Sequence, residues 1–228
     1  MQEHHFDTRD DAAIAAAEKI AGLIKRRLEA QEAASLVVPG GTTPASCFEA
    51  LSRTDLDWNA VTVVLSDERW VAPDSEDSNE KLVRDTLIKR QATGASLLSV
   101  FDPASTPDAR AESLTDEIRS LPFPFACSLL GMGEDGHFAS LFPDADKLEE
   151  GLDTESTILC LAVYTAASPH PRLSLSLSAL SRSDEIVLLV FGQTKLDVLE
   201  AARQPGSELP IAHLLRQKRA PVNVYWAP

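Results

Sequence analysis

Short apolar runs alternate with longer amphipathic stretches along most of the chain. Apolar residues recur at helical spacing from Asp10 to Ala33, with acidic residues at the start and basic residues near the end, which predicts a helix. Short apolar, often β-branched runs predict strands at 35–38, 61–65, 126–130, 157–163, 185–191 and 222–226. Further helices are predicted at 44–51, 79–89, 107–120 and from GQTK through residue 202, with a strand turning into a helix at 172–180.

The order of these elements indicates the fold class. Short strands of nearly continuous apolar residues, separated by helices, are typical of βαβ units in a mostly parallel sheet buried on both faces. We therefore expect an α/β fold with helices on both faces of the sheet. No internal repeat, low-complexity stretch or long linker interrupts the pattern, so residues 1–228 are expected to form a single domain.

Four predicted strands end in polar segments rich in glycine or charge. These segments are PGGTTP, SDERW, GMGEDGH and GQTK. In open α/β sheets the ligand crevice lies outside the carboxyl ends of the strands. We expect the four segments to converge there into one site.

Composition restricts the partners and the compartment. A net charge of −14 disfavours nucleic acid and anionic membranes, and requires any anion-binding site to be locally positive. No apolar run is long enough to span a membrane, and the N-terminus is too polar for a signal peptide. Cys47, Cys127 and Cys160 show no C-x-x-C pairing and are expected to be buried thiols in a reducing compartment. A cytoplasmic location is expected.

The segment from Gly131 to Pro143 carries the most specific chemistry. Asp135 and His137 flank Gly136 in a loop that leaves a predicted strand. A neutral imidazole, with a reference pKa of about 6.5, accepts a proton at neutral pH, and a nearby carboxylate orients it. A lone histidine is more often structural, but this arrangement predicts a catalytic pair.

The other segments each allow two interpretations. The glycines of PGGTTP would let backbone N–H groups face an anion, or simply make a turn capped by threonine. The segment matches neither the P-loop nor the G-x-G-x-x-G pattern. Asp67 and Arg69 lie in SDERW, where a surface salt bridge is the alternative to a site. Lys195 begins a helix, where a cation is unfavourable unless an anion is present. Arg172 follows a Pro-His-Pro turn, and for both cations a solvated surface charge is the alternative.

Taken together, these segments resemble the bacterial 6-phosphogluconolactonase family. The resemblance runs through PGGTTP, LSDERWVAPDSEDSNEKLVRDTL, LLGMGEDGHFASLFP, PHPRLSLSLSAL and IVLLVFGQTK, in the family's order. It implies a Rossmann-like open sheet of the glucosamine-6-phosphate deaminase and ribose-5-phosphate isomerase type. It also implies hydrolysis of 6-phospho-D-glucono-1,5-lactone to 6-phospho-D-gluconate in the oxidative pentose phosphate pathway.

The resemblance also implies roles for individual residues. His137 would be the general base that activates water, with Asp135 beside it. Asp67 and Arg69 would line the sugar site, with Arg69 a candidate for contact with the oxyanion. The residues implied to hold the phosphate and nearby hydroxyls are Gly40, Gly41, Thr42, Arg172 and Lys195.

Some positions depart from the family pattern or lack a role in it. Pro39 and Thr42, in the glycine loop, stand where serine is common in the family, and Phe138 stands where threonine is usual. Asn79 belongs to a Ser-Asn signature of the family but receives no role.

Two rival functions remain. Glucosamine-6-phosphate deaminase-type aldose–ketose isomerases follow a similar Asp-Gly-His loop with Asn-Glu-Pro, whose Glu assists ring opening, whereas residues 139–143 here contain no acid. A non-catalytic sugar-phosphate-binding sensor would usually carry a DNA-binding module, and no basic or helix-turn-helix segment is visible. A serine hydrolase is disfavoured because no G-x-S-x-G elbow occurs.

The expected reaction requires little additional machinery. A δ-lactone is an activated ester, so neither a covalent nucleophile nor a metal or other cofactor is expected. The alternative is a carboxylate–imidazole metal site formed by Asp67, Glu68, Asp135 and His137. The protein is expected to act as a monomer or weak homodimer on a small sugar phosphate.

Overall fold

The main sheet contains seven strands that are all parallel. The computed structural model describes residues 1–228, and the strand order is β1-β10-β9-β6-β2-β3-β5. The α/β fold with a parallel open sheet is therefore confirmed. The strands are β1 (Gln2–His5), β2 (Ala34–Val38), β3 (Val61–Leu65), β5 (Ser96–Leu97), β6 (Cys127–Leu130), β9 (Ile186–Phe191) and β10 (Val222–Ala227).

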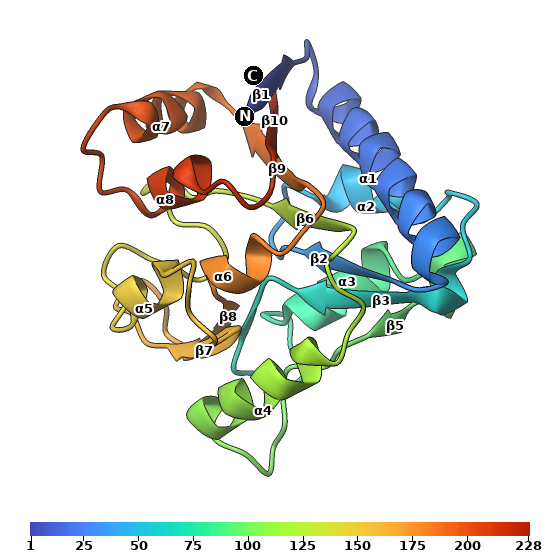
Figure 1. Ribbon diagram of the computed structural model, residues 1–228, viewed down its shortest axis with the longest axis horizontal. Coiled ribbons are helices and arrows are strands. Elements are labelled where there is room, and N and C mark those ends of the chain that lie inside the picture. The colour runs from blue at the N-terminus through green and yellow to red at the C-terminus, as the bar shows by residue number, and fades with distance from the viewer.

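Helices cover both faces of this sheet. In Figure 1, α1 and α2 lie on one side of the sheet, whereas α6 and α8 lie on the other. The longest helix, α1, packs its alanine-rich face and Ile20 and Ile24 against β2, β6, β9 and β10. The helices are α1 (Arg9–Gln31), α2 (Ala45–Leu51), α3 (Asn79–Thr86), α4 (Pro107–Arg119), α5 (Leu148–Leu152), α6 (Leu177–Leu180), α7 (Gln193–Arg203) and α8 (Pro210–Arg216), with 3₁₀ turns η1 (Trp58–Ala60) and η2 (Arg90–Gly94).

A second, antiparallel sheet of three strands lies beside the main one. Its order is β4 (Asp67–Arg69), β8 (Arg172–Leu175) and β7 (Cys160–Val163). The expected strand-to-helix segment at 172–180 is confirmed as β8 followed by α6. The sequence did not predict that SDERW forms a strand, because its charge suggested only a segment leaving β3. Pairing with β8 supplies the hydrogen bonds that make it one.

Several elements differ from the expected boundaries. β1 was not predicted because QEHH is polar, but it pairs with β10, where the His4 ring stacks on Tyr225 at 4.8 Å between centroids. The helix expected at 79–89 ends at Thr86, because the N–H groups of Leu87 and Ile88 both bond to the carbonyl of Val83. α5 and α8 were also not predicted.

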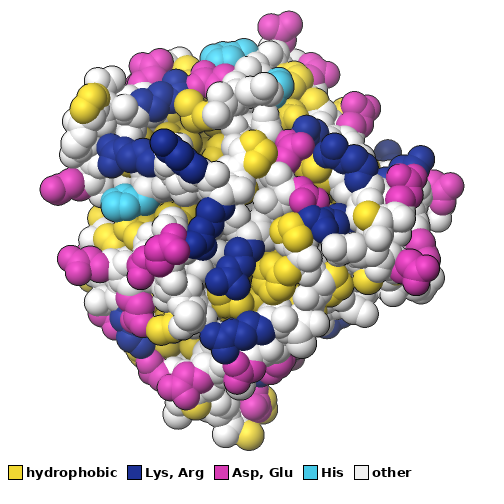
Figure 2. Space-filling model, in the orientation of Figure 1, with side chains coloured by type: hydrophobic (Ala, Val, Ile, Leu, Met, Phe, Trp, Pro, Cys, Tyr) yellow, Lys and Arg dark blue, Asp and Glu magenta, His cyan; other side chains and the backbone are white.

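One hydrophobic core of 61 buried residues extends from α1 to β10 and includes side chains from both sheets, so the small sheet is packed onto the large one. No helix combines the length and the apolar character needed to cross a bilayer. The negative charge is unevenly spread over the surface. Figure 2 shows Lys and Arg side chains gathered along the middle of one face, with Asp and Glu mostly toward its rim.

Candidate active site

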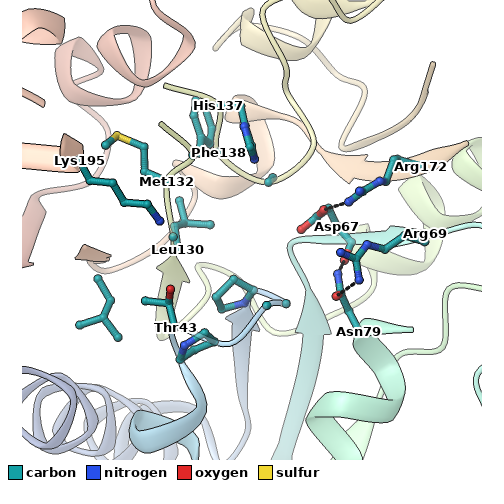
Figure 3. A pocket seen from close by; sticks show the side chains of 18 residues that line it. Thr43, Asp67, Arg69, Asn79, Leu130, Met132, His137, Phe138, Arg172 and Lys195 are labelled. Atoms are coloured by element: carbon teal, nitrogen blue, oxygen red, sulfur yellow. Dashed lines mark hydrogen bonds and ion pairs between the residues drawn. The ribbon is translucent and has the colours of Figure 1, made fainter. Parts of the chain in front are cut away.

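A crevice of about 290 Å³ lies at the carboxyl edge of the main sheet. Strands β9, β6, β2 and β3 are consecutive neighbours there, and each is followed by one of the four polar segments. The predicted convergence of these segments is thus confirmed (Figure 3). The polar side chains of the wall are Thr43, Asp67, Arg69, Asn79, His137, Arg172 and Lys195.

His137 and Asp135 form a hydrogen-bonded pair in the loop after β6. The imidazole Nδ1 lies 2.5 Å from Asp135 Oδ1, which also accepts the backbone N–H of His137 at 3.2 Å. With Nδ1 donating its proton to the carboxylate, Nε2 keeps a free lone pair. The ring lines the crevice and remains 28% exposed, so water can reach it. This arrangement suits a general base oriented by a carboxylate.

Glycines make the space that this pair occupies. A Cβ added to Gly133 would lie 2.3 Å from Nδ1 of His137 and 2.5 Å from Oδ1 of Asp135. Gly136, between the two side chains, has φ +80°, a backbone conformation that other residues rarely adopt. The loop therefore needs glycine at Gly133 to leave room for the imidazole and at Gly136 to turn.

The ring of Phe142 lies between the His137 imidazole and the Arg172 guanidinium and contacts both. Its ring centroid is 4.2 Å from that of His137, and the Arg172 guanidinium lies 5.6 Å from the same ring. Phe142 is itself buried, with 6% exposure. Sequence reasoning missed this role, because an apolar residue after a loop is most simply interpreted as core.

Arg69 and Arg172 are direct cross-strand partners on β4 and β8. Like charges in this position destabilise a sheet. Asp67 Oδ2 offsets part of the repulsion from 3.5 Å away from Arg172 Nη1. Burial, and secondarily the charge of Arg69, lower the pKa of Arg172, whereas Asp67 raises it. An anion in the crevice would relieve the remaining repulsion.

The Asp67 carboxylate is already held by the protein. Its Oδ1 accepts a hydrogen bond from Ser66 Oγ at 3.0 Å, and its Oδ2 accepts one from Ser140 Oγ at 2.5 Å. With 8% exposure, Asp67 reaches the crevice wall as predicted, but both of its oxygens have protein partners.

Lys195 stands apart from the arginines, in the first turn of α7 on the opposite side of the crevice (Figure 3). It makes no hydrogen bond or ion pair with another side chain. The helix begins after Gly192, which has φ +90°, with no side-chain cap and no acidic residue in its first turn. The ammonium group and the positive end of the helix are both available to an anion.

The glycine loop after β2 contributes less than the sequence predicted. Gly40 and Gly41 line the crevice, but Thr42 is exposed and lies outside the wall, which contains Thr43 instead. Gly41 has φ +80°, so it requires glycine for the turn. The threonine predicted to face the phosphate is therefore one residue away from the one that lines the crevice.

Asn79 and Glu68, for which the sequence predicted no role in substrate binding, form hydrogen bonds that link β4 to the start of α3 beside the crevice. Asn79 lines the crevice, donates from Nδ2 to the carbonyl of Asp67 at 2.8 Å, and accepts from Arg69 Nη1 at 3.1 Å. Glu68 is 1% exposed; burial raises its pKa, whereas four hydrogen-bond donors oppose that rise. The sequence signals for Asn79 were its position at a predicted helix start and its membership of the family's Ser-Asn signature. The alternative metal site of Asp67, Glu68, Asp135 and His137 is not assembled, since no group of three His, Cys, Asp or Glu side chains is close enough to share an ion.

Comparison with known proteins gives one consistent result. Residues 7–226 match a family model described as glucosamine-6-phosphate isomerases/6-phosphogluconolactonase. A 6-phosphogluconolactonase of Rhizobium meliloti is 37% identical over 99% of this chain and 98% of its own length. One from Pseudomonas aeruginosa is 38% identical over 93% of this chain and 89% of its own. The crystal structure of a 6-phosphogluconolactonase from Shewanella baltica superposes with a TM-score of 0.95 at 37% identity, covering 100% of this chain and 98% of the other.

Proposed function

The chain belongs to the glucosamine-6-phosphate isomerase/6-phosphogluconolactonase family, and we propose that it hydrolyses 6-phospho-D-glucono-1,5-lactone to 6-phospho-D-gluconate. The observation that carries the proposal is the His137–Asp135 pair, which faces a crevice lined by three cations. The pair supplies a base for water, and the cations supply a site for a phosphorylated sugar within a protein of net charge −14. This is the step of the oxidative pentose phosphate pathway that opens the lactone.

The chemistry follows from the free Nε2 of His137. Nε2 takes a proton from water as the water oxygen attacks C1 of the lactone, and a tetrahedral oxyanion forms. Asp135 stabilises the resulting imidazolium. When the oxyanion collapses, the bond between C1 and the ring oxygen breaks, and the imidazolium returns a proton to that oxygen. General base catalysis of this kind contributes about 10²–10⁴-fold.

The phosphate is assigned to the cations and backbone around the crevice. Lys195, the N-terminus of α7 and the loop at Gly40 and Gly41 attract it, and Arg172 contacts the phosphate or a nearby hydroxyl. Arg69 has one guanidinium nitrogen engaged by Asn79. Its remaining N–H groups are assigned to the oxyanion, where an oriented donor contributes about 10²–10³-fold.

The aldose–ketose isomerase alternative lacks an acid. Asp67 is the only carboxylate in the crevice wall, and it already accepts hydrogen bonds from Ser66 and Ser140 and pairs with Arg172. No free carboxylate remains to open a sugar ring, whereas lactone hydrolysis needs none besides Asp135.

A coupled assay separates the two activities. Freshly prepared 6-phosphogluconolactone is offered to the protein, and its disappearance is compared with spontaneous hydrolysis; glucosamine 6-phosphate is offered in a parallel reaction. We expect acceleration of the first reaction and no ammonia release in the second. Release of ammonia together with fructose 6-phosphate would replace the proposal with the isomerase alternative.

We further propose that the protein works in the cytoplasm as a monomer or weak homodimer. Three buried cysteines without a disulfide suit a reducing compartment. Met1, Ile14 and Tyr164 are the only large hydrophobic side chains that are exposed, which leaves little apolar surface for a tight interface. Sedimentation equilibrium measures the association constant directly.

A further inference from the structure

We infer that Glu68 and Asn79 are positioning residues, which together hold Arg69 and the glycine loop in the geometry that the reaction needs. Neither is assigned to touch the reacting atoms. The kinetic part of the inference rests on the proposed lactonase function, because lactone turnover is its readout.

Glu68 fixes the start of α3. Its Oε1 accepts the backbone N–H groups of Arg69 and Asn79, both at 2.8 Å. Its Oε2 accepts Ser78 Oγ at 3.0 Å and the N–H of Glu80 at 2.7 Å. One buried carboxylate thus satisfies two of the N–H groups that a helix leaves open at its N-terminus, and joins that helix to β4.

This arrangement also anchors the loop between β4 and α3. The loop from Trp70 to Asp77 is flanked by Arg69 and Ser78, which both bond to Glu68, and Arg69 Nη1 donates to the carbonyl of Asp77 at 2.8 Å. Inside the loop, the N–H groups of Ser75 and Ser78 bond to the carbonyls of Ala72 and Ser75. The loop is therefore held by internal hydrogen bonds and contributes a carbonyl acceptor, that of Asp77, to the Arg69 guanidinium.

Asn79 transmits this anchoring to the crevice. Its Nδ2 donates to the Asp67 carbonyl and its Oδ1 accepts from Arg69 Nη1, so one amide sets the guanidinium relative to β4 (Figure 3). The amide also packs directly on the glycine loop: a Cβ added to Gly40 would lie 1.9 Å from Asn79 Oδ1.

Gly40 needs to be glycine because of this contact. Its backbone does not have the positive φ that Gly41 has, and the three atoms nearest to an added Cβ all belong to the Asn79 amide. Gly40 thus allows a close approach between the loop and Asn79, in addition to the contact with the phosphate proposed above. The loop and Arg69 are therefore coupled through a single side chain.

A double-mutant cycle tests the coupling. We expect Gly40→Ala alone to lower kcat/KM on the lactone by about tenfold or more, because a small displacement of site groups costs up to about 100-fold. In the Asn79→Ala background the same change should cost no more than about twofold, since the space is vacated. Equal factors in both backgrounds would overturn the inference.

A matched pair of variants tests Glu68. Glu80 is its neighbour on α3 and is similarly buried, but its carboxylate faces Arg84 and Ser99 rather than the site. We expect Glu68→Gln and Glu80→Gln both to lower the melting temperature. The kinetics are measured below both melting temperatures, where both variants are folded. There Glu68→Gln should lower kcat/KM by about tenfold or more, while kcat/KM of Glu80→Gln stays within about twofold of wild type. Equal kinetic losses would show that Glu68 acts only on stability.

A crystal structure of Asn79→Ala separates this inference from the proposed function. The Arg69 guanidinium should leave its wild-type position in that variant, whatever the enzyme's substrate. An unmoved Arg69 would refute the positioning role even if the lactone is the substrate. Wild-type protein without lactonase activity would refute the function and leave this readout valid. If Glu68→Gln does not fold, the positioning role of Glu68 is withdrawn, and the cycle at Gly40 and Asn79 decides that of Asn79.

Discussion

The two sides of the crevice present positive charge in opposite ways. On the side of β9 and α7, Lys195 makes no bond to another side chain and stands at an uncapped helix N-terminus. On the side of β4 and β8, Arg69 and Arg172 face each other across the small sheet, each held by hydrogen bonds to Asn79, Ser168 or Asp67. The Lys195 side therefore presents a cation without a side-chain partner, which we call the open side. The arginine side presents cations whose orientation is fixed by protein hydrogen bonds, which we call the held side.

This difference implies a division of labour. A cation without a partner gives its full attraction to an incoming anion but little geometric precision, whereas a held guanidinium gives orientation at the expense of part of its charge. We therefore assign capture of the phosphate mainly to Lys195, and alignment of the sugar and oxyanion to the arginines. His137, the proposed general base, lies between the two sides (Figure 3).

The largest loss of activity is expected from removing His137, the proposed general base. His137→Ala should lower kcat by about 10²-fold or more, because water would no longer be deprotonated during attack. Binding of the product 6-phosphogluconate, measured by calorimetry, should stay near the wild-type value, since both cationic sides remain. Near-normal turnover by a folded variant would contradict the central role of the imidazole. Asp135→Asn should be milder, because this residue orients the ring.

The open side is tested by Lys195→Ala. Loss of a charge-assisted contact worth about 1.5–3 kcal/mol should reduce kcat/KM on the phosphorylated lactone by about ten- to more than a hundredfold. A change confined to KM would indicate anchoring only, and an added fall in kcat would indicate that phosphate binding also aligns C1.

Unphosphorylated gluconolactone is the control for this variant. Wild type and Lys195→Ala should hydrolyse it similarly poorly. A proportional loss on both substrates would place Lys195 outside phosphate recognition and remove the contrast between the two sides.

Removing a cation from the held side should reduce the stability of the folded protein more than removing Lys195. Arg172→Ala leaves Asp67, which is 8% exposed, without its cation, and should lower the free energy of unfolding by about 1–3 kcal/mol. Lys195→Ala should change it by less than about 0.5 kcal/mol, because no side chain loses a partner. Urea denaturation of both variants measures the difference, and equal losses would abolish the distinction.

The smallest expected effect is that of chelation. Prolonged treatment with a strong chelator should leave turnover unchanged, because water is activated by the imidazole in the proposed scheme. Loss of activity that one divalent ion restores would replace this scheme with a metal-assisted one.

The sequence predicted the parts of the molecule in which local pattern and chemistry agree. The buried parallel strands, the segments at their ends and the pairing of Asp135 with His137 all follow from runs of adjacent residues. β1 and β4 escaped prediction because their residues are polar, and only distant partners, β10 and β8, make them strands.

The same limit applies to the site. Lys195 was located from helix electrostatics, which are local. The contacts of Phe142 with Arg172 and of Asn79 with Gly40 join segments far apart in sequence, and no local pattern encodes them. The choice between Thr42 and Thr43 depends on how a turn containing Gly41 is oriented, which residue type alone does not determine.

The pairing of β1 with β10 also bears on the order in which the chain folds. β1 is an edge strand whose only neighbour is formed by residues 222–227. During synthesis β1 leaves the ribosome before β10, yet its hydrogen bonds become possible only after β10 has emerged. β2 and β3, which are close in sequence and adjacent in the sheet, can pair much earlier. The edge at β1 is thus completed late, and β9 remains an edge strand until β10 has emerged.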